Sequence, residues 1–372
     1  MNTIKQTIPH AQLEVSRSAV LNNYRYYRSK LKPGTKMLVV VKANSYGHGA
    51  TEFARLLEEA GVDYLGVATP LEGIRLRKDG IKLPILVLTT GTESYPEIIE
   101  YDLEPGIPTM EALKRFSDEV AKSGRSGYPI HITLDTGMHR LGFVQQELDA
   151  LMAFMKIEKN LKVKSFYSHL AAADEYVHDD FTRGQIALFE QMSEKLSASF
   201  GYKPLRHILN TAGIERFTEF QMDMVRLGLG IYGFSYDDQK PLQTTCSFRC
   251  PIIQIKHLKP EDGTVGYGRK GLLSKNGNTI ATICVGYADG LNRHLGNGKA
   301  SFEVNGKMAP TIGSICMDMC MIDITGIDAE VGDIVTIFGK NPTAKDLADK
   351  IATIPYEIFT AIDSRVKRIM VD

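Results

Sequence analysis

Eight short apolar runs recur along the first two thirds of the chain and constrain its fold most strongly. Most of the gaps between them carry a helical spacing of apolar residues, as in 51–60, 109–123 and 182–199. This alternation favours an α/β fold with a closed parallel (β/α)8 barrel of the TIM type, and a doubly wound open sheet is the alternative. The runs lie at 37–41, 63–68, 84–88, 101–105, 129–134, 163–169, 205–209 and 222–227.

The pattern changes after the eighth run. A polar stretch, 234–243, is followed by short β-like runs that alternate with Gly, Asp and Asn turns, with one short helical pattern among them. We therefore expect a barrel domain over 11–240 and a mostly-β C-terminal domain over 245–372. The strand-like run 11–16 either belongs to the first domain or joins the β domain.

Composition excludes several classes of function. Lysine and arginine number 44, as do aspartate and glutamate, so the chain shows no basic excess for nucleic acid. No apolar segment reaches the ~18 residues of a membrane span, and the N-terminus lacks an apolar signal core. The five cysteines form no CxxC pair and the nine histidines no HExxH motif, so no disulfide framework or metal site is indicated. We expect a cytoplasmic protein that acts on a small molecule.

Polar residues follow the ends of several predicted strands. Because functional residues of (β/α)8 barrels lie at the carboxyl ends of the strands, these positions are the candidates for a site. They are Lys42, Asp135 to Arg140, Ser168 and His169, Asn210 and Thr211, and Arg226.

Lys42, at the end of a buried strand, has two explanations. In a partly apolar pocket the ammonium loses its proton more easily, and the amine becomes a nucleophile that can hold an aldehyde cofactor as a Schiff base. Alternatively, the side chain reaches solvent or pairs with a carboxylate. The residues that follow Lys42 favour the first explanation.

The segment VVKANSYGHG, residues 40–49, resembles the pyridoxal-phosphate lysine segment of alanine racemases. The resemblance places Lys42 at the position of the lysine that holds the cofactor. It places Tyr46 at the position of a tyrosine that binds the cofactor phosphate. It thus implies pyridoxal 5'-phosphate as the cofactor and the barrel of the fold-type III family.

Three further segments match the family in its order: LDTGMHRLGF, YSHLAAADE and HILNTAGIERF. The first implies that Arg140 lies near the substrate carboxylate, which suits a guanidinium fork. The second places His169 beside the cofactor ring and Asp174 at the substrate entrance or behind the site. The third supplies Asn210 and Thr211 for the phosphate, which suits hydroxyl and backbone N–H groups.

The chain departs from the family pattern at Thr133. Many members have a lysine there, often carbamylated, whose negative group orients the arginine. Because Thr133 cannot supply that group, we expect either chloride or another side chain to steady Arg140, or a less tightly held arginine.

The segment DMVRLGLGIYGF contains a formal GxGxxG motif at Gly228, Gly230 and Gly233. A dinucleotide site is not indicated, because no long helix follows and no early βαβ unit surrounds the motif. The resemblance instead implies that Arg226 faces the cofactor ring nitrogen and that Gly228 and Leu229 touch the phosphate. An arginine keeps its proton, so the ring nitrogen should stay unprotonated, which disfavours transamination.

The C-terminal domain carries four further matching segments. By resemblance, Tyr267 is the second acid/base and Tyr287 lies near the substrate entrance. The backbone N–H of Met317 would meet the substrate carboxylate, with Asp318 beside it. Tyr356 would bind the cofactor phosphate.

Together these segments imply alanine racemization that supplies D-alanine for peptidoglycan. A planar intermediate needs a proton donor on each face, so Lys42 would serve the D-specific face and Tyr267 the L-specific face. We expect positive charge at His169 and Arg226 to ease deprotonation of the phenol. In the family this tyrosine comes from the neighbouring chain, which implies a homodimer with composite sites.

Three alternatives remain open at this point. One is an amino-acid racemase of broader specificity. Another is a carrier barrel in which Lys42 only stores pyridoxal phosphate, although such proteins lack a β domain. The third is a decarboxylase of similar architecture, which would want an acidic partner at the ring nitrogen where this chain has Arg226.

Overall fold

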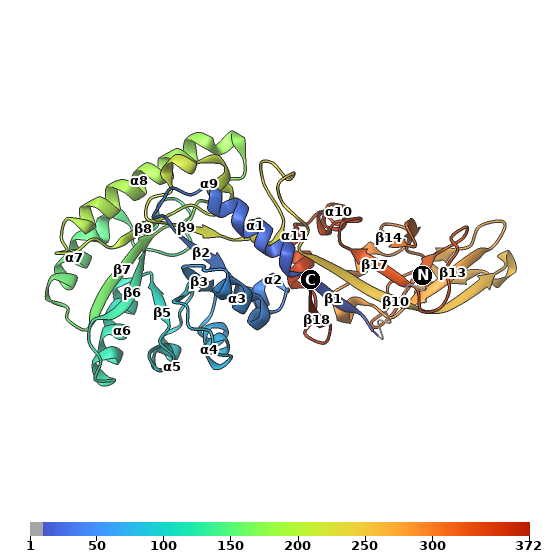
Figure 1. Ribbon diagram of the computed structural model, residues 1–372, viewed down its shortest axis with the longest axis horizontal. Helices are drawn as coiled ribbons and strands as arrows, with labels where there is room; N and C mark the ends of the chain where they lie inside the picture. Colours follow the sequence, from blue (N-terminus) through green and yellow to red (C-terminus); the bar gives the residue numbers. More distant parts are fainter. Residues whose placement is uncertain (1–9) are drawn as a thin grey trace. The chain divides into compact units, whose positions relative to one another are not determined.

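The computed structural model describes residues 10–372, in which eight parallel strands form a nearly closed barrel (Figure 1). Strands β2 to β7 each pair with the next strand in the chain, and β9 pairs with β2. Arg226 N donates to Leu209 O at 2.9 Å, which brings β9 towards the end of β8. The predicted barrel is confirmed and the doubly wound sheet is wrong, because the strand order never reverses. The strands are β2 (Lys36–Val40), β3 (Tyr64–Val67), β4 (Ile85–Val87), β5 (Glu104–Ile107), β6 (Tyr128–Thr133), β7 (Leu161–Tyr167), β8 (Leu205–His207) and β9 (Met224–Leu227).

The fourth barrel strand begins later than the predicted run 101–105. Tyr101 and Asp102 complete the turn after α5 (Tyr95–Glu100), where Asp102 has a φ of 50° and Leu103 N donates to Ile98 O at 2.9 Å. The strand therefore starts only at Glu104. An aspartate in the left-handed region ends a helix without the glycine that usually marks such a turn.

Helices lie on the outside of the barrel (Figure 1). Their starts follow capping rules: Thr109 Oγ1 accepts from Ala112 N at the start of α6, and Asn210 Oδ1 accepts from Gly213 N at the start of α9. The other helices of this layer bury an apolar face against the barrel. The helices are α1 (Arg17–Ser29), α3 (Ala50–Glu59), α4 (Pro70–Lys78), α5, α6 (Met110–Lys122), α7 (Leu148–Ile157), α8 (Asp179–Ser197) and α9 (Thr211–Arg216).

A second eight-stranded sheet contains the strands of the C-terminal half. The first strand of the chain, β1 (Gln12–Ser16), runs antiparallel to β10 (Cys246–Leu258) and parallel to β18 (Lys367–Val371). The run 11–16 thus lies in the β sheet. The other members are β13 (Asn278–Ile283), β14 (Ser301–Val304), β15 (Lys307–Pro310), β16 (Cys320–Asp323) and β17 (Ile334–Phe338), beside the ribbon β11 (Thr264–Val265) and β12 (Gly271–Leu272) and the helices α10 (Ala344–Lys350) and α11 (Pro355–Thr360).

The described chain divides into two compact units. Residues 20–45 and 50–243 form the barrel unit, and residues 10–19, 46–49 and 244–372 form the C-terminal unit. The predicted domains, 11–240 and 245–372, differ from these units in the segments 10–19 and 46–49. Within residues 10–372 no helix has both the length and the apolar character needed to cross a membrane.

Specific contacts explain why the segment 46–49 belongs to the C-terminal unit. Arg368 Nε donates to Gly47 O at 2.9 Å, and His48 Nε2 lies 3.0 Å from Thr245 Oγ1. Gly47 has a φ of 80°, and a Cβ on it would lie 2.1 Å from the Phe359 carbonyl oxygen. Only glycine therefore fits at this position.

We expect Gly47→Ala to lower the thermal midpoint of unfolding far more than Gly306→Ala. Both glycines have a φ of 80°, but nothing lies within 4 Å of a Cβ on Gly306. Gly306→Ala should cost about 1–2 kcal/mol for the left-handed backbone alone. Gly47→Ala adds overpacking of roughly 1–3 kcal/mol. Equal losses in calorimetry of the two variants would contradict the tight contact.

Candidate active site

Lys42 follows β2 after one residue, Val41, and is half-buried. Burial, together with the nearby charge of Arg140, lowers the pKa of the Lys42 amine, and Glu72 opposes the shift. More of this amine is therefore neutral at a given pH than of an exposed lysine. The first explanation of Lys42, a nucleophilic amine, fits this environment.

The residues that follow the lysine form an unusual left-handed turn. Residues 43–46 have φ values of 51°, 56°, 53° and 47°, although none is glycine. Such a conformation costs roughly 1–2 kcal/mol per residue, and strain of this kind concentrates at functional sites. Hydrogen bonds hold the turn: Ala43 N donates to Glu72 Oε1 at 2.6 Å, and Ala50 N donates to Asn44 Oδ1 at 2.8 Å.

Arg226 carries a buried guanidinium and is only 4% exposed. Its Nη1 donates to His207 Nδ1 at 2.9 Å and to the carbonyl of the same residue at 3.1 Å. Its Nη2 donates to the carbonyls of Ser168 at 2.5 Å and Ile208 at 3.0 Å, and to His169 Nδ1 at 3.2 Å. Burial lowers the pKa of Arg226 to about 10, so the group stays charged at neutral pH among neutral acceptors.

His169 is neutral in this arrangement. Burial, and then the charges of Arg226, Arg140 and Lys42, lower its pKa to about 3. Because Arg226 can only donate, the Nδ1 atom of His169 must carry a lone pair. The expectation that His169 supplies positive charge to the second base is therefore wrong, and Arg226 keeps that role as a hypothesis.

Hydrogen bonds connect several of the residues predicted for the phosphate. Thr211 Oγ1 accepts from Gly228 N at 3.0 Å and from Gly230 N at 3.4 Å. Both hydroxyl lone pairs are then used, so the hydroxyl hydrogen can serve another acceptor. Asn210 caps the helix that begins at Thr211, and Leu229 is buried in the turn after Gly228. The Thr211 hydroxyl hydrogen is therefore available to an anion.

Arg140 is exposed on a loop that leaves and rejoins β6. Asp135 N donates to Phe143 O and Phe143 N donates to Thr133 O, both at 2.9 Å, and these bonds close the loop. Asp135 Oδ1 also accepts from His139 N at 3.0 Å. The loop is therefore ordered by Asp135, and it presents Arg140 near the charge of Lys42.

Thr133 has its own partner at the end of β6. Its hydroxyl makes a hydrogen bond with the phenol of Tyr167, a buried residue of β7. In the family pattern this position carries a group that orients the arginine. Thr133 instead bonds to the neighbouring strand β7. Asp174, predicted at the entrance, lies exposed in the loop after β7. The structure brings Lys42, Arg140, His169 and Arg226 together but does not link Asp174 to them within the described residues.

A second group of predicted residues lies in the C-terminal unit. The rings of Tyr46 and Tyr356 are 5.4 Å apart. Tyr46 is 6% exposed, and burial followed by the influence of Tyr356 raises its pKa. The phenol of Tyr46 therefore keeps its proton at neutral pH and can donate it to an anionic oxygen.

Three further predicted residues of this unit are exposed, although their side chains are large and apolar. Tyr267 is 71%, Met317 53% and Tyr287 43% exposed. Tyr287 N donates to Cys316 O, and Ala288 N donates to Met317 O, both at 3.0 Å. The segments that carry Tyr287 and Met317 are therefore paired along their backbones.

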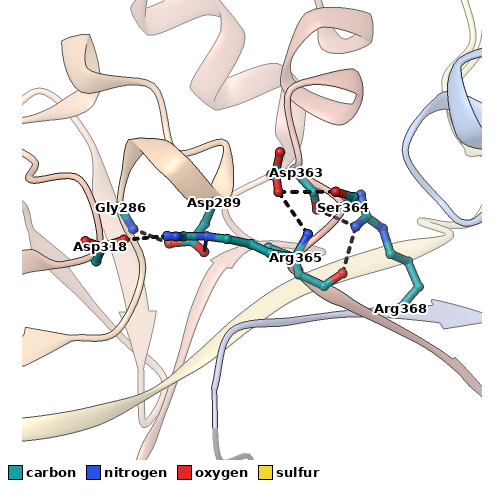
Figure 2. A network of polar contacts seen from close by, with 8 residues as sticks. Gly286, Asp289, Asp318, Asp363, Ser364, Arg365 and Arg368 are labelled. Atoms are coloured by element: carbon teal, nitrogen blue, oxygen red, sulfur yellow. Dashed lines mark hydrogen bonds and ion pairs between the residues drawn. The ribbon is translucent and has the colours of Figure 1, made fainter.

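Arg365 ties these paired segments together (Figure 2). Its Nε donates to Asp289 Oδ1 and its Nη2 to Asp318 Oδ1, both at 2.8 Å. Asp289 is buried, and its other oxygen accepts from Gly286 N at 2.8 Å. Asp318, predicted beside Met317 at the substrate entrance or behind the site, thus has a structural partner that fixes the segment.

Comparison with known proteins assigns the family. The model of the alanine racemase N-terminal domain matches residues 15–236, and that of the C-terminal domain matches residues 245–370. The chain belongs to the alanine racemase family. Members of this family are isomerases. A carrier barrel without a second domain does not account for the match over 245–370.

Individual relatives extend over nearly the whole chain. Alanine racemase 2 of Caldanaerobacter subterraneus subsp. tengcongensis is 36% identical over 97% of this chain and 94% of that protein. The alanine racemase of Methanococcus maripaludis is 34% identical over 96% of this chain and 97% of its own length.

Solved structures of the alanine racemase family agree with this fold. The alanine racemase of Clostridium difficile 630 superposes with a TM-score of 0.91 at 31% identity, covering 99% of this chain and 98% of that one. A structure of alanine racemase from Bartonella henselae with covalently bound pyridoxal phosphate superposes with a TM-score of 0.86 at 28% identity, covering 98% and 100% of the two chains.

Sequence reasoning missed several residues that hold the site. Glu72 stands third after Thr69 in a T-x-x-E pattern, the signature of a capping box, but nothing local connects it to Lys42. His207 precedes Asn210 within a matched segment and looked like an ordinary strand residue. Arg365 also lies in a matched segment, but its partners are far away in the sequence.

We expect Arg365→Ala to loosen the paired segments around Met317. The change removes the link between Asp289 and Asp318, so the amides of Tyr287 and Ala288 should exchange with deuterium several-fold faster. Lys345→Ala is the control, because Lys345 makes an exposed ion pair in the same unit. Unchanged protection of Tyr287 and Ala288 in Arg365→Ala would contradict the tether.

Proposed function

We propose that this protein interconverts L-alanine and D-alanine with pyridoxal phosphate, and that Lys42 and Tyr267 act as its two bases. Alanine racemization follows from membership of the family. The observation that carries the assignment of residues is an amine of lowered pKa at Lys42 together with the buried guanidinium of Arg226, both of which lie close enough to His169 to lower its pKa. The first would hold the cofactor covalently, and the second would face its ring.

The described residues fit pyridoxal phosphate. Arg226 is a buried cation whose protein acceptors are all neutral, so an electron-rich ring nitrogen would complete its surroundings. Thr211 offers a hydroxyl hydrogen, and Tyr46 a phenol that keeps its proton. We assign these groups, with Asn210, Gly228, Leu229 and Tyr356, to the phosphate, and His169 to the ring. When bound, the cofactor delocalises the negative charge left by loss of the substrate α-proton.

Arg226 supports racemization over the decarboxylase alternative. Its proton stays on the guanidinium at neutral pH, because even burial lowers its pKa only to about 10. A carboxylate at that place would instead favour a protonated ring nitrogen and a stronger electron sink. A weaker sink favours return of the proton to the substrate carbon, which is what a racemase needs.

Two bases on opposite faces account for inversion. The neutral amine of Lys42 can take the α-proton from one enantiomer, and a tyrosine can return a proton from the other face. We assign the second role to Tyr267, whose 71% exposure in a single chain fits a residue that serves a neighbouring one. The proposal therefore includes a homodimer in which each site receives Tyr267 from the partner chain.

The substrate carboxylate would meet a cation and a backbone donor. We assign these roles to Arg140 and to the N–H of Met317, with Tyr287, Asp174 and Asp318 near the entrance or behind the site. A small pocket would select alanine, whereas a racemase of broader specificity is the alternative. The five cysteines are free thiols, which fits our proposal of a cytoplasmic enzyme that supplies D-alanine for peptidoglycan.

The test is α-proton exchange of L-alanine in deuterated water with the cofactor-loaded protein, followed by chiral analysis. We expect deuterated D-alanine to appear, and Lys42→Ala to abolish both the exchange and the borohydride-reducible link to the cofactor. Exchange without inversion would overturn the two-base assignment. Comparable rates with serine, lysine and alanine would favour the broader racemase, and no exchange with any amino acid would overturn the proposal.

We expect Tyr267→Phe to retain bound cofactor but to lose racemization by at least about 100-fold, the usual contribution of a general acid or base. In single turnovers, exchange should survive better for D-alanine than for L-alanine, because Lys42 remains. Tyr101→Phe is the control, since Tyr101 precedes the start of β5, at the opposite end from the strand ends that carry the site. Equal loss for both enantiomers would count against Tyr267 as the L-specific base.

A further inference from the structure

A line of polar side chains crosses the interior of the barrel. Five neighbouring strands, β5 to β9, contribute one residue each. Glu104 Oε2 lies 2.7 Å from His131 Nε2, and His131 Nδ1 lies 2.6 Å from Ser165 Oγ. Ser165 Oγ lies 2.9 Å from His207 Nε2, and His207 Nδ1 lies 2.9 Å from Arg226 Nη1. We call these five residues the polar relay.

The polar relay occupies positions where barrels usually place branched apolar side chains. His131, Ser165 and His207 are all 0% exposed. Burying such groups costs free energy unless every one is hydrogen-bonded, and an apolar filling avoids that cost. Packing alone therefore gives no reason for this set of residues.

The charged ends fix the direction of the hydrogen bonds. A guanidinium only donates, so His207 Nδ1 accepts from Arg226. Burial, and then the charge of Arg226, lower the pKa of His207 far below its usual value, so the ring is neutral with its proton on Nε2. His207 Nε2 therefore donates to the Ser165 hydroxyl.

The same reasoning from the other end gives the same direction. Burial alone would raise the pKa of Glu104, but hydrogen bonds from His131 and Tyr64 and the charge of Lys164 bring it below the usual range. Glu104 is therefore a carboxylate that only accepts, and His131 carries a proton on Nε2. The Ser165 hydroxyl accepts from His207 Nε2, and its one hydrogen is left to donate to His131 Nδ1. Every bond points from Arg226 towards Glu104.

We propose that Glu104, His131 and Ser165 are positioning residues that fix the tautomer of His207 and thereby the orientation of the Arg226 guanidinium. This inference rests on the proposed function, because Arg226 faces a cofactor only there. A proton on His207 Nδ1 would set two donors against each other over 2.9 Å. The negative end of the relay prevents that state, although Glu104 lies four strands away from Arg226.

The effect of replacing Glu104 should be transmitted through His131 and Ser165 to His207. In Glu104→Leu, His131 loses the acceptor that holds its proton on Nε2. The Ser165 hydroxyl can then reverse, and His207 can place a proton on Nδ1 and displace the guanidinium. Glu104→Gln keeps a carbonyl acceptor for His131 and should largely preserve the tautomers. Ser165→Ala interrupts the relay directly.

The experiment is nitrogen-15 NMR of the histidine side chains in the cofactor-loaded full chain, with the cofactor absorbance spectrum as a second readout. In the unmodified protein we expect His207 and His131 to show a protonated Nε2 and an unprotonated Nδ1. Ser165→Ala and Glu104→Leu should change the His207 pattern and shift the cofactor absorbance, while Glu104→Gln should resemble the unmodified protein. Ser117→Ala is the matched control, because Ser117 is buried and bonds to Glu158 outside the relay.

The outcomes separate this inference from the proposed function. A protonated Nδ1 on His207 in the unmodified protein would overturn the relay, whatever the activity. So would a folded Glu104→Leu variant with unchanged His207 signals and cofactor spectrum. If the expected tautomers are present but alanine is not racemized, the relay stands and the proposed function fails. If Glu104→Leu does not fold, Ser165→Ala against Ser117→Ala decides.

Discussion

The buried positive charge of Arg226 is the constraint on which the barrel site depends. A guanidinium at 4% exposure must find acceptors for its donors, and it finds them in backbone carbonyls at the ends of β7 and β8 and in two imidazoles. Those imidazoles must stay neutral to accept, which determines the charge of His169 and His207. One fixed charge thus sets the protonation of its surroundings.

The short segment after Lys42 links residues that belong to different units. A left-handed turn of four non-glycine residues, 43–46, follows Lys42 of the barrel unit and ends at Tyr46 of the C-terminal unit. The conformation is strained, and a hydrogen bond to Glu72 holds its first residue, while Arg368 donates to Gly47, the residue that follows the turn. Lys42 and Tyr46 thus lie four residues apart in the chain while each belongs to its own unit.

Much of the fold and of the candidate site could be predicted from local sequence patterns. The eight apolar runs correspond to the eight barrel strands, because strands covered on both faces are continuous apolar segments. Lys42 and Arg226 were found because polar groups at strand ends are conspicuous there. The start of β5 was missed, since Asp102 turns the chain without a glycine. The predicted positive charge of His169 was wrong, because the protonation state of this ring depends on Arg226, a donor from another strand.

The order of strands and helices, the barrel and β domains, and the residue types at the strand ends follow from the sequence, because they depend on spacing along the chain. Which of these residues come into contact depends on the folded chain. Glu72 beside Lys42, Arg365 between two loops and the line from Glu104 to Arg226 all join distant positions. These contacts determine the burial of each group and the direction of its hydrogen bonds. The protonation state of each group therefore depends on the fold.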